Sequence, residues 1–247
     1  MQDHKKQVMV GGPIDPIPGT DLQPTLDAQS YFAVDYVDTW NSMNPEDVDR
    51  ADYLIIPGGV PDINPSLYGE EDAGSHDVDE ELDRIQLAMV DRAVQQRKPI
   101  LGICRGIQLV GAYFGASMIQ DLRETVHHTD LDDPHFHKIY NVPGSYFYNV
   151  YKDVMTVNSA HHQALRKIPD YFRVLSLWCK DDETAEHYLK LAAEEKLTEG
   201  SDECVIEAVE HKDYPFLGLQ YHPELERNFL CRHIDRARIR DYFYTMK

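Results

Sequence analysis

The sequence lacks several features that would assign it to a class of protein at once. It has no run of about eighteen apolar residues, so we expect no transmembrane helix. Its first residues lead into only a short apolar stretch, so we expect no signal peptide. It also contains no internal repeat and no low-complexity tract. These absences predict a globular protein of the cytoplasm.

Positive charge is scarce. The chain has 24 lysines and arginines against 43 aspartates and glutamates, which gives a formal net charge of −19 at pH 7. Such a surface repels phosphate backbones and anionic lipid headgroups, so we expect neither nucleic acid nor a membrane as a partner. It also repels an anionic substrate at long range. A ligand that carries a carboxylate therefore has to be captured by local hydrogen-bond donors.

Cysteine is rare as well. The four cysteines are widely spaced and form no CxxC pair, which argues against a disulfide framework and against a structural zinc site. Histidines and carboxylates gather in residues 127–137, but their spacing matches no strong metal motif. The favoured interpretation of that segment is a polar loop that begins a strand. We therefore expect no metal site there.

What the first half of the sequence does contain is an alternation of strand-like and helix-like stretches. The expected strands are Gln7–Val10, Ala33–Asp38, Tyr53–Ile56 and Ile100–Ile103, and the expected helical segments are Leu26–Phe32, a short one after Asn44, and Asp79–Arg97. Parallel strands need such crossover helices. We therefore expect one α/β domain over residues 1–247, with a doubly wound, mostly parallel sheet flanked by helices.

The second half changes character. Residues 124–151 predict strands joined by a loop near Pro143, and Phe172–Trp178 predicts a further strand. Asp181–Thr198 is acidic and helix-prone, and the chain closes with a helix-like segment at Arg227–Tyr244. Between these two segments, strands at 204–209 and 216–221 are joined by a short turn and should pair. The sheet is thus expected to carry a small antiparallel extension.

Cys104 lies where a strand-like stretch meets a helix-like one. Gly102 and Gly106 flank it, as in a nucleophile elbow, where a tight turn lifts a side chain above the edge of the sheet. The N-terminus of the following helix favours a thiolate. A cysteine between apolar residues is also commonly a small buried hydrophobe, so a second feature has to support catalysis.

That second feature is the pair His222 and Glu224, which follows the strand-like stretch Phe216–Tyr221. Residues two apart in an extended chain point to the same side, so the carboxylate can orient the imidazole. Pro223 between them favours an extended His222. A histidine at a strand end is often only a surface residue, but together with Cys104 the pair predicts a nucleophile, a base and an orienting group.

Two further stretches are weaker candidates. Gly59 ends the glycine pair after the strand Tyr53–Ile56, so its backbone N–H is a candidate oxyanion-hole donor, although such pairs usually mark an ordinary turn. The stretch Asn158–Gln163 is dense in hydrogen-bonding side chains. It could hold the amino and carboxylate groups of a substrate, or it could be a capped turn.

Four separated motifs together resemble those of the gamma-glutamyl-gamma-aminobutyrate hydrolase family, cysteine gamma-glutamyl hydrolases with a class I glutamine amidotransferase-like (flavodoxin-like) fold. The motifs are Pro57-Gly58-Gly59 with Asp62, Pro65 and Leu67-Tyr68-Gly69-Glu70; Gly102-Ile103-Cys104-Arg105-Gly106-Ile107-Gln108; Val157-Asn158-Ser159 with His161 and Gln163; and Gly218-Leu219-Gln220-Tyr221-His222-Pro223-Glu224. They occur in the family's order and cover most of the chain.

The resemblance implies roles for individual residues. Cys104 is the expected nucleophile, His222 the general base and Glu224 the residue that orients it, while the backbone N–H groups of Gly59 and Arg105 form the oxyanion hole. The side chains expected near the glutamyl group are Gln108, Asn158, Ser159, His161 and Gln163. The reaction that the resemblance implies needs no metal and no organic cofactor.

The resemblance also implies a reaction. We expect hydrolysis of the gamma-glutamyl amide bond of a small compound, such as gamma-glutamyl-gamma-aminobutyrate, through a glutamyl thioester, in polyamine (putrescine) catabolism. Two alternatives stay open: a glutaminase that delivers ammonia to a synthetase partner, and a non-catalytic binding protein on the same fold. The sequence does not fix the oligomeric state and leaves a homodimer open. Compared with the family, the acidic segment 181–203 is long, which suggests a lid, an oligomer contact or an ornament.

Overall fold

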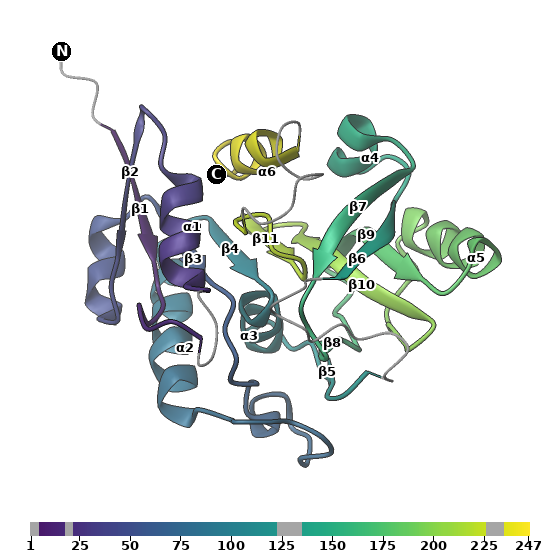
Figure 1. Ribbon diagram of the computed structural model, residues 1–247, viewed down its shortest axis with the longest axis horizontal. Coiled ribbons are helices and arrows are strands. Elements are labelled where there is room, and N and C mark those ends of the chain that lie inside the picture. The colour runs from purple at the N-terminus through teal and green to yellow at the C-terminus, as the bar shows by residue number, and fades with distance from the viewer. Residues whose placement is uncertain (1–4, 18–21, 123–134, 226–234) are drawn as a thin grey trace.

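The computed structural model describes residues 5–17, 22–122, 135–225 and 235–247 (Figure 1). The described strands form one sheet in the order β2-β1-β3-β4-β11-β10-β9-β6-β7, with β8 beside β10 and β5 beside β8. Their bounds are β1 (Lys6–Val10), β2 (Val37–Asn41), β3 (Tyr53–Ile56), β4 (Ile100–Ile103), β5 (Met118–Ile119), β6 (His135–Asn141), β7 (Val154–Ser159), β8 (Ala164–Leu165), β9 (Phe172–Cys179), β10 (Cys204–His211) and β11 (Phe216–Leu219).

The two ends of the sheet differ in strand direction. From β2 through β1, β3 and β4 to β11, all neighbouring strands are parallel. From β11 through β10, β9 and β6 to β7 they are antiparallel, and β10 and β11 pair through the short turn after His211 as expected. The expected α/β sheet with an antiparallel extension is therefore confirmed.

Helices cover both faces of the sheet (Figure 1). They are α1 (Pro24–Phe32), α2 (Glu80–Gln95), α3 (Arg105–Tyr113), α4 (Tyr146–Tyr151), α5 (Asp182–Ala193) and α6 (Asp235–Phe243), with short 3-10 helices η1 (Pro45–Arg50) and η2 (Pro65–Tyr68). Side chains of α2, α3 and α5 share one buried cluster with Leu54 and Ile56 of β3, whereas α1, α4 and α6 share the other with Ile55. Successive residues of β3 thus point to opposite faces of the sheet, and each face is covered by helices, as in a strand that is buried on both faces.

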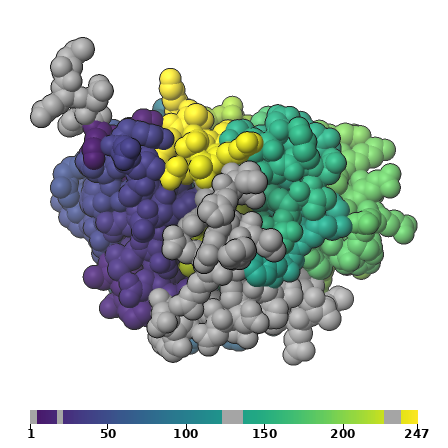
Figure 2. Space-filling model, turned by 45° about the horizontal axis from the view of Figure 1, so that its top comes forward, coloured from purple at the N-terminus to yellow at the C-terminus, as the bar shows by residue number. Residues whose placement is uncertain are grey.

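The C-terminal helix α6 lies at the surface between the N-terminal part of the chain and the part that carries α4 (Figure 2). The rings of Tyr242 and Tyr146 stack with their centroids 3.9 Å apart, so α6 contacts α4. Phe243 lies edge to face with Phe32 of α1 at 6.0 Å. Aromatic contacts of this kind add to the burial of the rings themselves, so α6 connects the parallel and antiparallel parts of the molecule.

Two elements differ from the expected ones. The strand expected at Ala33–Asp38 begins later, because Ala33 ends α1 and β2 occupies Val37–Asn41. The aromatic stretch after Pro143 forms the helix α4 and not a strand. Its helix is capped by Ser145, whose Oγ accepts a hydrogen bond from the Tyr148 N–H at 3.1 Å, and this local cap outweighs the strand propensity of the aromatic residues.

Several other expectations concern segments that the structure describes only in part. The histidine- and aspartate-rich residues 127–134 and the first part of the expected C-terminal helix, residues 227–234, lie outside the described residues.

The acidic segment 181–203 forms α5 and the turn that follows it, and α5 packs against β9. In the described ranges, no helix is both long enough and apolar enough to span a bilayer. The single domain over residues 1–247 stays a prediction.

Candidate active site

Three adjacent parallel strands end at one place. β3 is followed by the Gly58-Gly59 turn, and β4 is followed directly by Cys104. His222 lies three residues after the end of β11. The register pairs β4 with both β3 and β11, so these strand ends lie side by side. Ligand sites of open α/β sheets lie at the carboxyl ends of their strands. The candidate site is therefore built near the centre of the whole sheet, on the three parallel strands that lie next to its antiparallel part.

The backbone at Cys104 has the geometry of a tight strand-to-helix turn. Its φ is 51° and its ψ is −108°, a conformation that non-glycine residues rarely adopt. The N–H of Cys104 still donates to the Leu219 carbonyl at 2.7 Å, which ties the turn to β11. The strand-to-helix turn expected at Cys104 is confirmed, and its strained backbone is typical of functional positions.

The flanking glycines allow the helix α3 to approach the sheet. A Cβ at Gly106 would lie 2.1 Å from the Ile56 carbonyl oxygen, and one at Gly102 would lie 2.5 Å from the carbonyl oxygen of Gly106. Both neighbouring atoms belong to the backbone, so no side-chain rotation can relieve these contacts. These two positions accept only glycine without a shift of α3.

His222 is oriented by two neighbours. Its Nδ1 lies 2.7 Å from Glu224 Oε1, and both side chains are buried. Its backbone is held by the Asn158 amide group: the His222 N–H donates to Asn158 Oδ1 at 2.8 Å, and Asn158 Nδ2 donates to the His222 carbonyl at 2.7 Å. Glu224 therefore holds the ring, and Asn158 holds the backbone that carries it.

His222 also lies against Cys104. A Cβ built on Gly58 would be 2.6 Å from His222 Cε1 and 3.3 Å from Cys104 Cβ, so both side chains border this glycine. Burial of the imidazole lowers the pKa of His222, but the charges of Glu224 and Cys104 and their hydrogen bonds to the ring outweigh it. The net effect raises the pKa of His222 well above its ordinary value. An imidazolium beside a cysteine is an arrangement that stabilises a thiolate.

A pocket opens above these residues. Of the residues predicted for the site from the sequence, the structure places in its wall Gly59, Cys104, Arg105, Gln108, His161, Gln163 and His222. Glu224 lies behind His222 and contacts it from the buried side. No described residue of segment 181–203 lines this pocket, so the interpretation of that segment as a lid has no support here.

Two predicted contact residues are placed elsewhere. Asn158 and Ser159 are the last residues of β7, are 2% and 0% exposed, and are not part of the pocket wall. The Asn158 amide is occupied by the backbone of His222. The structure thus places these two side chains outside the pocket wall, where Asn158 holds the backbone of His222, and their expected position near a glutamyl group stays a prediction.

The Arg105 side chain points away from the pocket centre. Its guanidinium is buried against Asp83 and Gln86, and its Nε donates to the Pro61 carbonyl at 2.7 Å. Burial lowers the pKa of Arg105, while the Asp83 carboxylate opposes that effect. Because Arg105 is the first residue of α3, its backbone N–H has no carbonyl of a preceding helical turn as an acceptor.

A buried carboxylate that the motifs did not predict lies beneath the pocket. Glu207 of β10 is fully buried, and its Oε1 lies 3.3 Å from His137 Nε2 and 3.6 Å from His161 Nε2. Burial raises the pKa of Glu207, but the two histidines outweigh it and lower the pKa to about 2. This ionised carboxylate lies beside the imidazoles of both histidines. The sequence does contain one sign of this buried group, because Glu207 is the single charged residue in the otherwise apolar stretch 204–209.

Known proteins resemble this chain in both sequence and fold. The family model described as Peptidase C26 matches residues 38–224. Protein NtpR of Enterococcus hirae is 31% identical over 188 residues, which cover 72% of this chain and 69% of that protein. Gamma-glutamyl-gamma-aminobutyrate hydrolase of Escherichia coli O157:H7 is 29% identical over 177 residues, which cover 71% of this chain and 65% of that enzyme.

A solved structure shows the fold. A crystal structure of a GMP synthase subunit from Thermoplasma acidophilum is 21% identical, has a TM-score of 0.63, and covers 98% of this chain and 94% of that one. The fold is thus that of the class I glutamine amidotransferases. Since the family model matches most of the chain, the chain belongs to the Peptidase C26 family of glutamine-amidotransferase-like hydrolases.

Proposed function

We propose that this protein hydrolyses the gamma-glutamyl amide bond of small gamma-glutamyl compounds and releases glutamate and an amine. The observation that carries the proposal is the position of His222, which borders Cys104 and whose Nδ1 lies 2.7 Å from Glu224 Oε1, beside a pocket at the carboxyl ends of parallel strands. A nucleophile, a base and an orienting carboxylate in this order are the parts of a catalytic triad. The likeness to gamma-glutamyl-gamma-aminobutyrate hydrolase supports the choice of bond.

In the first half of the proposed reaction, the Cys104 thiolate attacks the side-chain carbonyl carbon of the glutamyl group. A C–S bond forms and the carbonyl electron pair moves to oxygen. The backbone N–H groups of Gly59 and Arg105, both in the pocket wall, are the proposed donors to this oxyanion. The intermediate then expels the amine, which takes the proton from the ring nitrogen of His222 that does not face Glu224.

In the second half, water hydrolyses the glutamyl thioester. His222, now neutral, takes a proton from the water as its oxygen attacks the thioester carbonyl carbon. The second tetrahedral intermediate collapses, the C–S bond breaks, and glutamate leaves with Cys104 restored as a thiolate beside the imidazolium. Glu224 stabilises the imidazolium in both halves because its carboxylate lies against Nδ1. The chain's own residues supply every group that this sequence of steps needs.

The glutamyl group is proposed to lie against Gln108, His161 and Gln163. Gln108 comes from α3, and its Nε2 donates to the Gln163 carbonyl at 3.2 Å. His161 Nδ1 lies 3.0 Å from the same carbonyl oxygen. These contacts hold the loop after β7 against α3, so the groups that face the pocket are fixed before a substrate binds.

The test is glutamate release from gamma-glutamyl-gamma-aminobutyrate, from a gamma-glutamyl anilide and from free glutamine. We expect release from the two gamma-glutamyl amides by the wild-type protein and none above background by Cys104→Ala. Cys179→Ala is the matched control, because Cys179 is a buried cysteine on β9 outside the pocket wall. It should retain the wild-type rate.

Other outcomes would contradict the proposal. Turnover of glutamine alone, or only after a synthetase is added, would favour a glutaminase. Binding without turnover would favour a non-catalytic protein. A role in polyamine catabolism follows only if the preferred leaving amine derives from putrescine, which the same comparison of substrates measures.

A further inference from the structure

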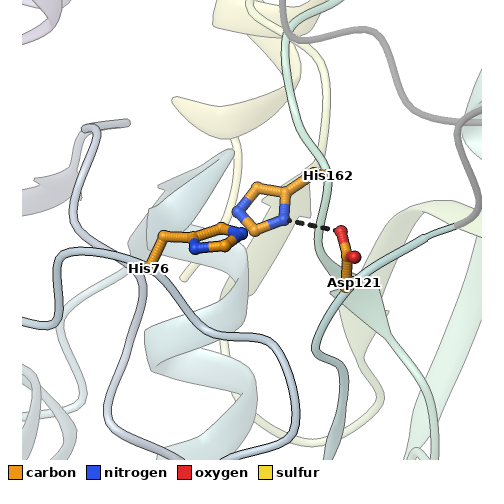
Figure 3. Close-up of side chains that lie close together, drawn as sticks. All are labelled: His76, Asp121 and His162. Atoms are coloured by element: carbon orange, nitrogen blue, oxygen red, sulfur yellow. Dashed lines mark hydrogen bonds and ion pairs between the residues drawn. The ribbon is translucent and has the colours of Figure 1, made fainter.

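Three side chains with metal-ligating groups lie close together (Figure 3), and two of them, His76 and His162, line the pocket. His76 comes from the segment between η2 and α2, Asp121 follows β5, and His162 follows β7. Each offers one ligand atom, and these atoms all lie within 4.8 Å of one another. They come from segments about 40 residues or more apart in the sequence, so only the fold brings them together.

A fourth side chain sets the orientation of His162. Its Nε2 lies 3.0 Å from Asp62 Oδ2 and 3.1 Å from Asp62 Oδ1, while its Nδ1 faces Asp121 Oδ1 at 3.2 Å. A carboxylate on one ring nitrogen places a proton there and leaves the lone pair of the other nitrogen for a metal ion. Metal-bound histidines commonly have such an outer carboxylate, which also makes the imidazole a stronger ligand.

The distance between the inner ligand atoms suits a single ion. Zinc–nitrogen and zinc–oxygen bonds are about 2.0–2.2 Å long, so two ligand atoms at a tetrahedral angle are about 3.4 Å apart. The 3.2 Å between His162 Nδ1 and Asp121 Oδ1 is close to that separation. His76 is exposed and its ring centroid is 5.0 Å from that of His162, so a small side-chain rotation would bring it to the same ion.

The backbone around the three residues is held in place by hydrogen bonds. Gln163 Nε2 donates to the Gln120 carbonyl at 2.8 Å and to Ser75 Oγ at 3.2 Å, which connects all three segments. The Leu122 N–H donates to the His162 carbonyl at 2.7 Å, and the His76 N–H donates to Asp62 Oδ2 at 2.7 Å. The ligand positions are therefore set by the fold and do not need to be assembled by the ion.

We propose that His76, Asp121 and His162 bind one divalent transition-metal ion of the zinc class at the rim of the pocket, with Asp62 as the outer carboxylate of His162. Two histidines and one carboxylate leave a fourth position open on a tetrahedral ion. The site is separate from Cys104, His222 and Glu224, and it does not depend on the proposed hydrolysis. It departs from the expectation, drawn from the sequence, of a protein without a metal.

The test measures zinc binding directly. The protein is prepared without a histidine tag, stripped with a chelator, and carries Cys104→Ala, because a thiolate beside His222 could itself bind zinc. Equilibrium dialysis should give one Zn²⁺ per chain, and Co²⁺ should give the visible absorption bands of a four- or five-coordinate ion. We expect His76→Ala and Asp121→Asn each to weaken binding by at least about tenfold.

Two control variants separate a site from general attraction by an acidic protein. His187→Ala removes an exposed histidine on α5, and Asp77→Asn removes an exposed carboxylate next to His76. Both should bind Zn²⁺ as the parent does. Equal losses in Asp77→Asn and Asp121→Asn, binding unchanged in His76→Ala, or no binding by the Cys104→Ala parent would each overturn the proposal. Circular dichroism checks that each variant is folded. If Asp121→Asn unfolds, zinc binding by His76→Ala decides the outcome, because His76 is exposed and its loss should not affect folding.

Discussion

At the scale of single residues, the hydrogen bond between His222 and Glu224 is the feature on which the proposed chemistry depends most. Glu224→Gln keeps the size of the side chain and removes its charge. We expect kcat for a gamma-glutamyl anilide to fall by about 10²- to 10⁴-fold, because the imidazolium loses its stabilising carboxylate and the ring loses its fixed orientation. Steady-state kinetics at neutral pH measure this loss.

The same variant has a specific effect on pH dependence. Glu224 and Cys104 raise the pKa of His222 against the effect of burial, so the imidazolium that we propose as the proton donor to the leaving amine persists to a higher pH than an ordinary histidine would allow. The rate should therefore fall on the alkaline side as His222 loses its proton, and Glu224→Gln should move that fall to lower pH. Glu199→Gln, the same change at an exposed position, should alter neither kcat nor the pH profile. An unchanged alkaline limb in Glu224→Gln would contradict the assigned role.

At the scale of elements, the crossing of α3 over β3 determines where Cys104 is held. Gly106→Ala would place a Cβ 2.1 Å from the Ile56 carbonyl oxygen, so α3 would have to move away from the sheet. We expect the free energy of unfolding to fall by about 2 kcal/mol or more, in the range of overpacked cores, and kcat to fall with it. Urea unfolding and the anilide assay measure the two effects.

Gly111→Ala is the matched control on the same helix. Its Cβ would meet the flexible end of Leu165, with Cδ2 at 2.8 Å, so a side-chain rotation can relieve the contact. Alanine also favours a helix by about 1 kcal/mol over glycine. The stability change should therefore stay within about 1 kcal/mol. Equal losses in the two variants would show that backbone contact at Gly106 has no special effect.

The elements that were predicted correctly have strong local signals. Strands β3 and β4 are short apolar runs, and α2 is capped by Asp79, whose Oδ1 accepts hydrogen bonds from the N–H groups of Glu81 and Leu82 at 3.1 and 2.9 Å. The stretch that became α4 was ambiguous, because aromatic residues favour a strand, whereas the cap by Ser145 and the burial of Phe147 favour a helix. Local patterns thus predict elements whose burial is evident from their own residues.

The site was predictable to a similar extent. Cys104, His222 and Glu224 follow the ends of strands within recognisable motifs. Parallel strands have their carboxyl ends on the same side, so the sequence predicts that these residues meet there. The contact of Glu207 with His137 could not be found this way, because it joins single residues 70 positions apart that face each other only after β6, β9 and β10 have paired. Side chains that meet across the sheet leave no local pattern in the sequence.

At the scale of the whole molecule, the net charge of −19 acts on any charged substrate before it reaches the pocket. At neutral pH gamma-glutamyl-gamma-aminobutyrate carries a net charge of −1, because its two carboxylates outnumber its one ammonium group, whereas a gamma-glutamyl anilide is a neutral zwitterion. The protein's field repels the first compound and leaves the second almost unaffected. The range of this field is about 30 Å at 0.01 M salt and about 8 Å at 0.15 M.

Raising the salt concentration between these two values should therefore increase kcat/KM for gamma-glutamyl-gamma-aminobutyrate by about two- to fivefold and leave kcat/KM for the anilide unchanged. The neutral substrate is the internal control, since any effect of salt on the protein's folding or on Cys104 would change both values together. A parallel rise for both substrates would show that salt acts on the enzyme itself. A fall for the anionic substrate alone would mean that a local positive charge outweighs the acidic surface; a metal ion bound by His76, Asp121 and His162 would supply such a charge, and repeating the measurement after chelation would identify it.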